Sequence, residues 1–133
     1  ITNYEELGHG ISVVPQNVAE HVALDVGIVA PPANSREDAV TIVARDSRTP
    51  YDFEFRKFLS DLAVKNSVPF KVDTHFRYGS DASLAAIAGF DANFACFGPG
   101  VDASHSYERT TIKAVEASAE LLAAYLLADR KGV

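Results

Sequence analysis

Four side chains of the sequence have the chemistry to hold a metal ion or move a proton. Glu5 and Glu6 are adjacent in the stretch NYEELGHG, Asp25 interrupts the apolar run HVALDVGIV, and His105 lies in the polar stretch ASHSYER. Carboxylates and imidazole together suit Zn²⁺, Co²⁺ or Mn²⁺. Of two adjacent glutamates, one can ligate a metal while the other takes the proton of an activated water molecule.

Each of these residues also has a simpler interpretation. Glu5 and Glu6 can be two solvated acids near a chain end, and a single histidine in a loop is usually just exposed. Asp25 should be partly buried, and a buried carboxylate must accept hydrogen bonds, pair with a base or bind a metal, because burying an unpaired charge is costly. The four residues are spread over about a hundred positions, unlike a compact H-E-x-x-H helix. Spacing alone therefore leaves both interpretations open.

Composition narrows the class of protein. The chain has 133 residues, enough for one domain, and a net charge of −6 from 12 basic and 18 acidic residues. This charge argues against nucleic acid as the main partner, because phosphate binding needs a basic surface. Cys96 is the only cysteine, which excludes an internal disulfide and a cysteine-based metal cluster, and no apolar run approaches the ~20 residues that span a bilayer. Because the sequence contains no methionine, we interpret it as a piece of a longer protein.

Strand-like and helix-like segments alternate along the chain. Apolar, β-branched runs predict strands at 21–29, 39–46, 70–76 and 92–98, and helical spacing of apolar residues predicts helices at 51–67, 81–90 and 110–131. Thr110 or Thr111 is available to cap the last helix, and the stretch 99–109 is predicted to be a loop. This order indicates a layered α/β/α sandwich. In such folds ligands bind outside the carboxyl ends of strands, where we expect Asp25, the 75–81 turn and the loop of His105.

Four short motifs occur in order along the chain: YEELGHGIS, VALDVGIV, YGSDAS and GVDASHSYERT. Together they resemble the C-terminal part of the catalytic domain of the M42 family of metallo-aminopeptidases, and the resemblance covers essentially all of residues 1–133. It implies a zinc-peptidase-like α/β/α sandwich with a mixed sheet, incomplete at the N-terminus. It also implies a cytoplasmic homo-oligomer that releases N-terminal residues from peptides with two divalent metal ions (Zn, Co or Mn), without nucleic-acid or membrane partners.

The resemblance also implies roles for individual residues. Glu5 falls on the family's general base and Glu6 on a metal ligand. Asp25 falls on a ligand of the other metal, and His105 on a ligand of the same metal as Glu6. In the implied mechanism, water bridging the two metals attacks the peptide carbonyl, and Glu5 delivers the water's proton to the departing amine.

Two further parts of the motifs have expected roles near the site. Ser80 and Asp81 match the family's stretch near the substrate cleft, which implies substrate binding, although Asp81 can equally be a plain helix cap. Glu108 and Arg109 are expected to orient the loop of His105 through hydrogen bonds.

The sequence departs from the family pattern at its start. Two further ligands, a histidine in a His-x-Asp stretch and an aspartate bridging both metals, belong upstream of Glu5, so only three of five expected ligands are present. We therefore expect residues 1–133 alone to bind metal weakly and to hydrolyse little. We also expect them to self-associate through an exposed apolar patch or strand edge. Two alternatives remain: a non-catalytic fragment or interaction module, and a metal-independent glycoside hydrolase that uses the paired carboxylates.

Overall fold

The computed structural model describes residues 14–15 and 17–129 of the chain, so Glu5 and Glu6 lie outside the described residues. Five strands and three helices follow one another in the order β1 (Glu20–Leu24), β2 (Gly27–Ile28), β3 (Val40–Arg45), α1 (Phe53–Lys65), β4 (Phe70–Thr74), α2 (Asp81–Ile87), β5 (Asn93–Val101) and α3 (Ile112–Leu127). None of the helices in this part of the chain is long and apolar enough to cross a membrane.

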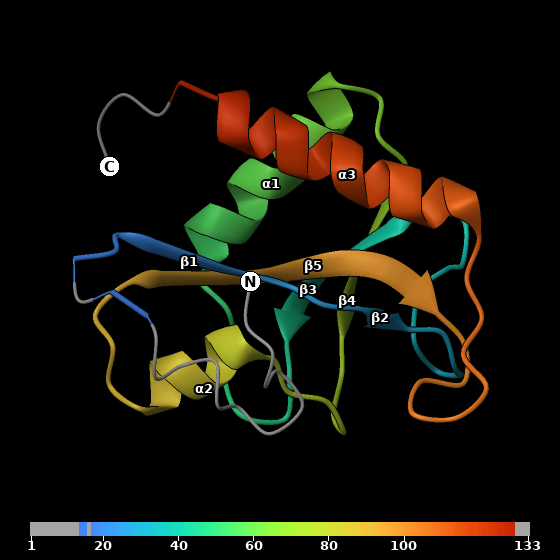
Figure 1. Ribbon diagram of the computed structural model, residues 1–133, viewed down its shortest axis with the longest axis horizontal. Helices are drawn as coiled ribbons and strands as arrows, with labels where there is room; N and C mark the ends of the chain where they lie inside the picture. Colours follow the sequence, from blue (N-terminus) through green and yellow to red (C-terminus); the bar gives the residue numbers. More distant parts are fainter. Residues whose placement is uncertain (1–13, 16, 130–133) are drawn as a thin grey trace.

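The strands form one mixed sheet with the order β1-β5-β3-β4, and β2 also pairs with β5. β1 and β2 run parallel to β5, and β3 runs parallel to β4, but β3 and β5 are antiparallel. Figure 1 shows α1 and α3 over one face of the sheet and α2 over the other. The predicted α/β/α sandwich with a mixed sheet is confirmed.

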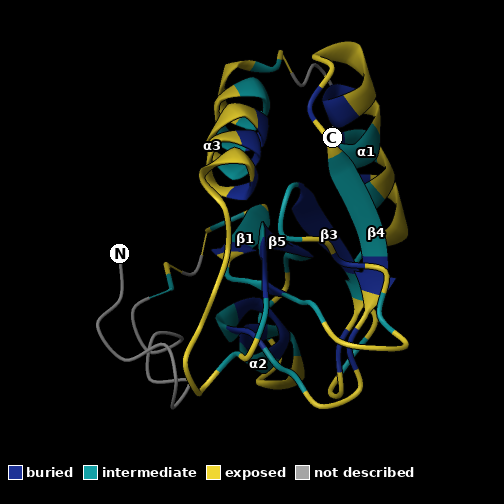
Figure 2. Cartoon of the chain, turned by 90° about the vertical axis from the view of Figure 1, so that its right-hand side faces the viewer, coloured by how far each residue is buried: buried dark blue, intermediate teal, exposed yellow. Residues whose placement is uncertain are grey.

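Each face of the sheet has its own hydrophobic core, as the dark buried segments in Figure 2 indicate. The larger core lies between the sheet and the α1–α3 layer and is centred on fully buried side chains such as Ile42, Phe55, Leu59, Phe97 and Leu121. The smaller core lies under α2 and contains small residues, among them Ala82, Ala85 and Cys96. Burial of this apolar area is the main force that holds the layers together.

Two strands differ from their predicted ranges. The predicted strand 21–29 is divided at Asp25 into β1 and β2, and β5 continues to Val101, three residues beyond the predicted end at Gly98. Glycines allow this continuation. A Cβ atom on Gly98 would lie 1.5 Å from the carbonyl oxygen of Asp25, and one on Gly100 would lie 2.0 Å from that of Arg36. Pro99 and Gly100 were predicted to begin the 99–109 loop, because such residues usually interrupt strands, but here the glycines on either side of Pro99 admit close backbone neighbours.

Asp25 and His105 follow the parallel strands β1 and β5, at the carboxyl ends where they were predicted. The turn after β4 lies differently. Because β3 and β4 run antiparallel to β5, the carboxyl end of β4 and that of β5 lie at opposite ends of the sheet. The turn that follows β4 and the loop that follows β5 therefore approach the site from different ends of the sheet.

Candidate metal centre

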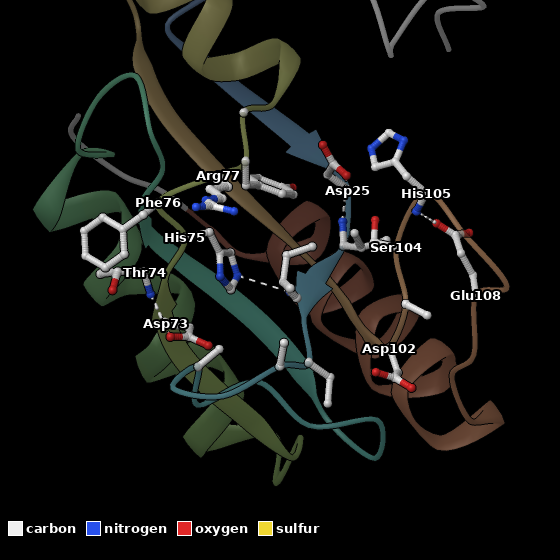
Figure 3. A pocket seen from close by; sticks show the side chains of 18 of the residues that line it. Asp25, Asp73, Thr74, His75, Phe76, Arg77, Asp102, Ser104, His105 and Glu108 are labelled. Carbon is white, nitrogen blue, oxygen red and sulfur yellow. Dashed lines mark hydrogen bonds between the residues drawn. The ribbon is translucent and has the colours of Figure 1, made fainter.

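A cavity of about 830 Å³ brings three segments of the chain together. Its lining comes from residues 24–33 around and after β2, residues 73–79 at the end of β4, and residues 102–108 after β5. Asp25 and His105, eighty positions apart in the sequence, both line it. Figure 3 shows their side chains at the same end of the cavity, with Asp73, His75 and Arg77 farther along it.

Asp25 occupies the break between β1 and β2. Its backbone N–H still donates to Phe97 O at 3.1 Å, and its Oδ1 atom accepts a hydrogen bond from the Val26 N–H at 2.8 Å. The residue is half-buried, as the sequence predicts. The break lets the carboxylate reach the cavity while the chain on either side stays paired with β5.

His105 lies in a tightly closed loop. Its φ is +66°, in the left-handed region that residues with a Cβ rarely adopt. Its backbone N–H donates to Glu108 Oε1 at 3.1 Å, which is the local hydrogen bond expected for Glu108. Asp102 and Arg109 close the loop through a pair of reciprocal backbone hydrogen bonds. The imidazole is therefore presented by a loop with a defined backbone conformation.

Some of the side chains that line the cavity are of the types that ligate a divalent metal. A carboxylate and an imidazole on the same cavity wall are suitable ligands for Zn²⁺, Co²⁺ or Mn²⁺. Within residues 14–15 and 17–129, no group of three or more His, Cys, Asp or Glu side chains has the arrangement of a metal site. Asp25 and His105 are thus two candidate ligands on one cavity. The predicted ligand Glu6 and the predicted base Glu5 lie outside the described residues.

Asp73 and His75 form part of the cavity that the sequence analysis did not single out. Asp73 Oδ2 accepts hydrogen bonds from Asn34 N, Ser35 N and Ser35 Oγ at 2.6–2.7 Å, so it fixes the 30–38 loop to β4. His75 Nε2 accepts a hydrogen bond from Ile28 N at 3.4 Å. Burial lowers the pKa of His75, although the nearby Asp73 carboxylate opposes this, so the imidazole is neutral and serves as an acceptor. In the sequence, the only feature that could have predicted this part of the cavity was an acid and a histidine, Asp73 and His75, close together at the end of a predicted strand.

Ser80 and Asp81 lie beside the cavity rather than on its wall, and neither lines it. Ser80 is the N-cap of α2: its hydroxyl accepts from Ser83 N and contacts the Tyr51 hydroxyl at 2.6 Å. The alternative that made Asp81 the cap is wrong, since Asp81 is the first residue inside the helix. Substrate contact by Ser80 or Asp81 stays a prediction.

Arg77 is the one Lys or Arg side chain that lines the cavity in the described part of the chain, and it is exposed. Cys96 is fully buried in the smaller core, and burial raises the pKa of its thiol to about 12. The thiol therefore stays protonated and behaves as a small apolar residue, as predicted.

The fold is similar to that of solved aminopeptidase structures. The TET aminopeptidase of the marine sediment archaeon Thaumarchaeota archaeon SCGC AB-539-E09 aligns with a TM-score of 0.69 at 16% identity, over 87% of this chain and 34% of that one. The TET1 peptidase of Pyrococcus horikoshii aligns with the same TM-score at 18% identity, over 80% of this chain and 32% of that one. At these identities the likeness concerns the fold alone.

Sequence similarity identifies the family. "Putative aminopeptidase YhfE" of Bacillus subtilis (strain 168) is 39% identical over 127 residues, which are 95% of this chain, and the match spans 37% of that protein's length. The chain therefore spans little more than a third of its curated relative. The model of the family described as M42 glutamyl aminopeptidase matches residues 1–121. With nine tenths of its length inside that match, the chain belongs to the M42 peptidase family.

Proposed function

We propose that residues 1–133 are the C-terminal part of the catalytic domain of a dinuclear metallo-aminopeptidase that releases N-terminal residues from peptides. One observation carries the proposal. In a chain of the M42 family, Asp25 and His105 line one cavity although eighty residues separate them. This is the arrangement expected if both are metal ligands, and it is not expected of an isolated exposed histidine.

The residues would divide the work as follows. Glu6, Asp25 and His105 would hold divalent ions together with ligands from outside this chain. Ions held there would polarise the scissile carbonyl and make water a stronger nucleophile near neutral pH. Glu5 would accept a proton from the attacking water and return it to the departing amine. The apolar wall formed by Val26, Val29 and the two prolines after Ala30 would exclude solvent from the peptide.

We also propose that the complete enzyme is a cytoplasmic homo-oligomer. The Pyrococcus horikoshii TET1 peptidase is described as assembling into a tetrahedron or a large octahedral shell. A single buried cysteine and the absence of any disulfide in the sequence are typical of a reducing compartment.

The test uses the complete catalytic domain, in which this chain is joined to the N-terminal portion of the enzyme. Metal-dependent hydrolysis of an aminoacyl-anilide is expected, and EDTA should abolish it. Glu5→Gln should lower kcat by at least about 10²-fold, and Asp25→Asn and His105→Ala should lower metal content. Replacement of a histidine outside the cavity, His21→Asn, and of an exposed acid, Asp91→Asn, provide matched controls.

The outcomes separate the alternatives. Full activity of Glu5→Gln would remove that residue as the base. Glycosidase activity that persists in EDTA would favour the paired-carboxylate hydrolase. A domain that takes up no metal and cleaves neither substrate would favour an interaction module. The 133-residue chain alone is expected to hydrolyse little, because it carries only three of the five ligands.

A further inference from the structure

A cluster of charged side chains connects the loop of His105 to the segment that precedes β3. Arg109 Nε lies 2.7 Å from Glu37 Oε1, and its Nη2 lies 3.4 Å from Glu37 Oε2 and 3.1 Å from Asp102 Oδ2. We name these three residues the Arg109 clamp. Glu37 precedes β3 and Asp102 follows β5, so the clamp joins two segments that are far apart in the sequence.

The loop that the clamp closes has a backbone conformation that needs support. Ala103 and His105 both have positive φ, +53° and +66°, although neither is a glycine. Such conformations cost of order 1 kcal/mol or more each and persist only when the surroundings impose them. The backbone pairing of Asp102 with Arg109 and the hydrogen bond from Ser106 N to Ala103 O supply part of that support.

The far side of the clamp is itself anchored. Thr111 is the N-cap residue of α3, as predicted, but its hydroxyl donates to the carbonyl oxygen of Glu37 and makes no cap hydrogen bond to the helix. The loop that carries Glu37 is also fixed to β4 by Asp73, through Asn34 and Ser35. Arg109 therefore connects the His105 loop to a segment that is itself hydrogen-bonded to β4 and to the start of α3.

The clamp is too exposed to contribute much to the free energy of unfolding. The Arg109 side chain is 67% exposed and that of Asp102 is 38% exposed. Ion pairs of this kind contribute about 0–1 kcal/mol, since water screens the charges. Its fork geometry, however, restrains position, because two nitrogen atoms of one rigid guanidinium contact two different segments.

We propose that Arg109 is a positioning residue: the Arg109 clamp fixes the loop that presents His105 at the same end of the cavity as Asp25. The proposal rests on the proposed role of His105 as a metal ligand. Removal of the clamp should leave the chain folded while the loop loses its defined conformation and the metal is held less tightly.

The first experiment needs neither metal nor activity. Hydrogen exchange of the backbone amides of residues 103–109 is compared in the 133-residue chain for wild type, Arg109→Gln, Glu37→Gln and Arg109→Lys. The two glutamine variants should exchange these amides at least about fivefold faster, and the lysine variant should be intermediate because it keeps the charge but loses the fork. Arg36→Gln, which breaks the exposed Arg36–Asp38 pair in the same 30–38 loop, is the matched control and should match wild type.

The second experiment measures Co²⁺ affinity in the complete catalytic domain by its visible absorption. Arg109→Gln should weaken Co²⁺ binding about tenfold, in the range seen when partners of metal ligands are removed, with partial rescue in Arg109→Lys. His105→Ala is measured in parallel. Unchanged affinity in His105→Ala would overturn the ligand assignment, and with it the proposed function. The positioning role alone would be overturned by a different result. In that case His105→Ala would weaken Co²⁺ binding, but Arg109→Gln would change neither the Co²⁺ affinity nor the hydrogen exchange of residues 103–109.

Discussion

Gly98 allows the backbone of Asp25 to pack closely against β5, because a glycine has no Cβ atom. A Cβ atom at this position would lie 1.5 Å from the Asp25 carbonyl oxygen, so an alanine must push the β1–β2 break away from β5. Gly98→Ala should destabilise the chain by about 1–3 kcal/mol, the usual cost of overpacking. It should also speed hydrogen exchange of the Asp25 and Val29 amides, which donate to β5. Urea unfolding and amide exchange measure the two effects.

A matched glycine separates this contact from backbone strain. Gly89 ends α2 at φ +89°, and nothing lies within 4 Å of a Cβ atom placed on it. Gly89→Ala should cost on the order of 1 kcal/mol because of its φ alone, without a change in exchange at Asp25. Equal exchange at Asp25 in the two variants would contradict the proposed contact.

Asp73 should make the stability of the chain depend on pH. Burial alone raises the pKa of Asp73, but hydrogen bonds from the Ser35 hydroxyl and from the N–H groups of Thr74, Ser35 and Asn34 outweigh it, and the pKa is lowered. A carboxyl with a lower pKa in the folded state binds fewer protons there than when unfolded. The stabilisation that the Asp73 carboxylate contributes is therefore complete above the pKa of an unfolded aspartate, about 3.9. It is lost as the pH falls through the lower pKa of the folded state.

Asp73→Asn tests this dependence by urea unfolding at several pH values. At pH 7 the variant should be less stable by about 1–3 kcal/mol, because an amide replaces a charged acceptor of buried donors. The difference from wild type should narrow as the pH falls below about 4. Asp91→Asn, at an exposed acid, should stay within about 0.5 kcal/mol of wild type throughout. A difference for Asp73→Asn that is constant with pH would show that its charge is not the cause.

Individual residues could be predicted from the sequence where their side-chain chemistry differs from that of their neighbours. Asp25 interrupts an apolar run, and this predicted its partial burial, which is confirmed. The ion pair between Glu37 and Arg109 joins residues 72 positions apart, and no local pattern specifies such a contact. His75 was not predicted as a site residue, because only the folded chain brings it onto the cavity wall.

At the scale of elements, α2 depends on its N-terminal cap. Ser80 and Ser83 form a capping box, and Ser80 also contacts the Tyr51 hydroxyl in a fully buried setting. Ser80→Ala should cost about 0.5–2 kcal/mol. Ser118, whose hydroxyl donates to a carbonyl inside α3, is the matched control, and Ser118→Ala should be close to neutral. Similar losses in the two variants would contradict the cap's importance for α2.

Asp81, the residue after this cap, tests the predicted substrate contact. If Asp81 contacts substrate, Asp81→Asn should raise KM in the complete catalytic domain without lowering the free energy of unfolding. A loss of stability with unchanged KM would make the 80–81 pair a structural feature of α2 only.

The elements themselves were predictable where periodicity is strong. All three helices and the strands of the sheet begin and end within four residues of the predicted ranges, apart from the division of the first predicted strand at Asp25. Strand direction was not predictable from the same patterns, since apolar runs carry no information about which neighbour a strand pairs with. The antiparallel contact of β3 with β5 places the ends of β4 and β5 at opposite ends of the sheet, although the segments that follow both strands line the cavity.

At the scale of the whole molecule, α3 has apolar residues on both sides. Its inner face buries Ala114, Ala117 and Leu121 against the sheet layer. Its outer face, shown largely as exposed in Figure 2, includes the apolar side chains of Ile112, Val115, Leu126 and Leu127, of which Leu127 is 85% exposed. Exposed large apolar side chains at both ends of one helix face make this face a candidate interaction surface.

We therefore expect the isolated 133-residue chain to self-associate through this outer face of α3. The chain spans 37% of the length of its Bacillus subtilis relative. Sedimentation velocity over a range of concentrations should show reversible association, and Ile112→Lys with Leu126→Lys should shift it toward monomer by at least about tenfold in the dissociation constant. Val64→Lys, at an exposed apolar residue of α1, is the control and should associate like wild type. A chain that stays monomeric at every concentration would exclude self-association, and association unchanged by the α3 substitutions would place the contact on another surface.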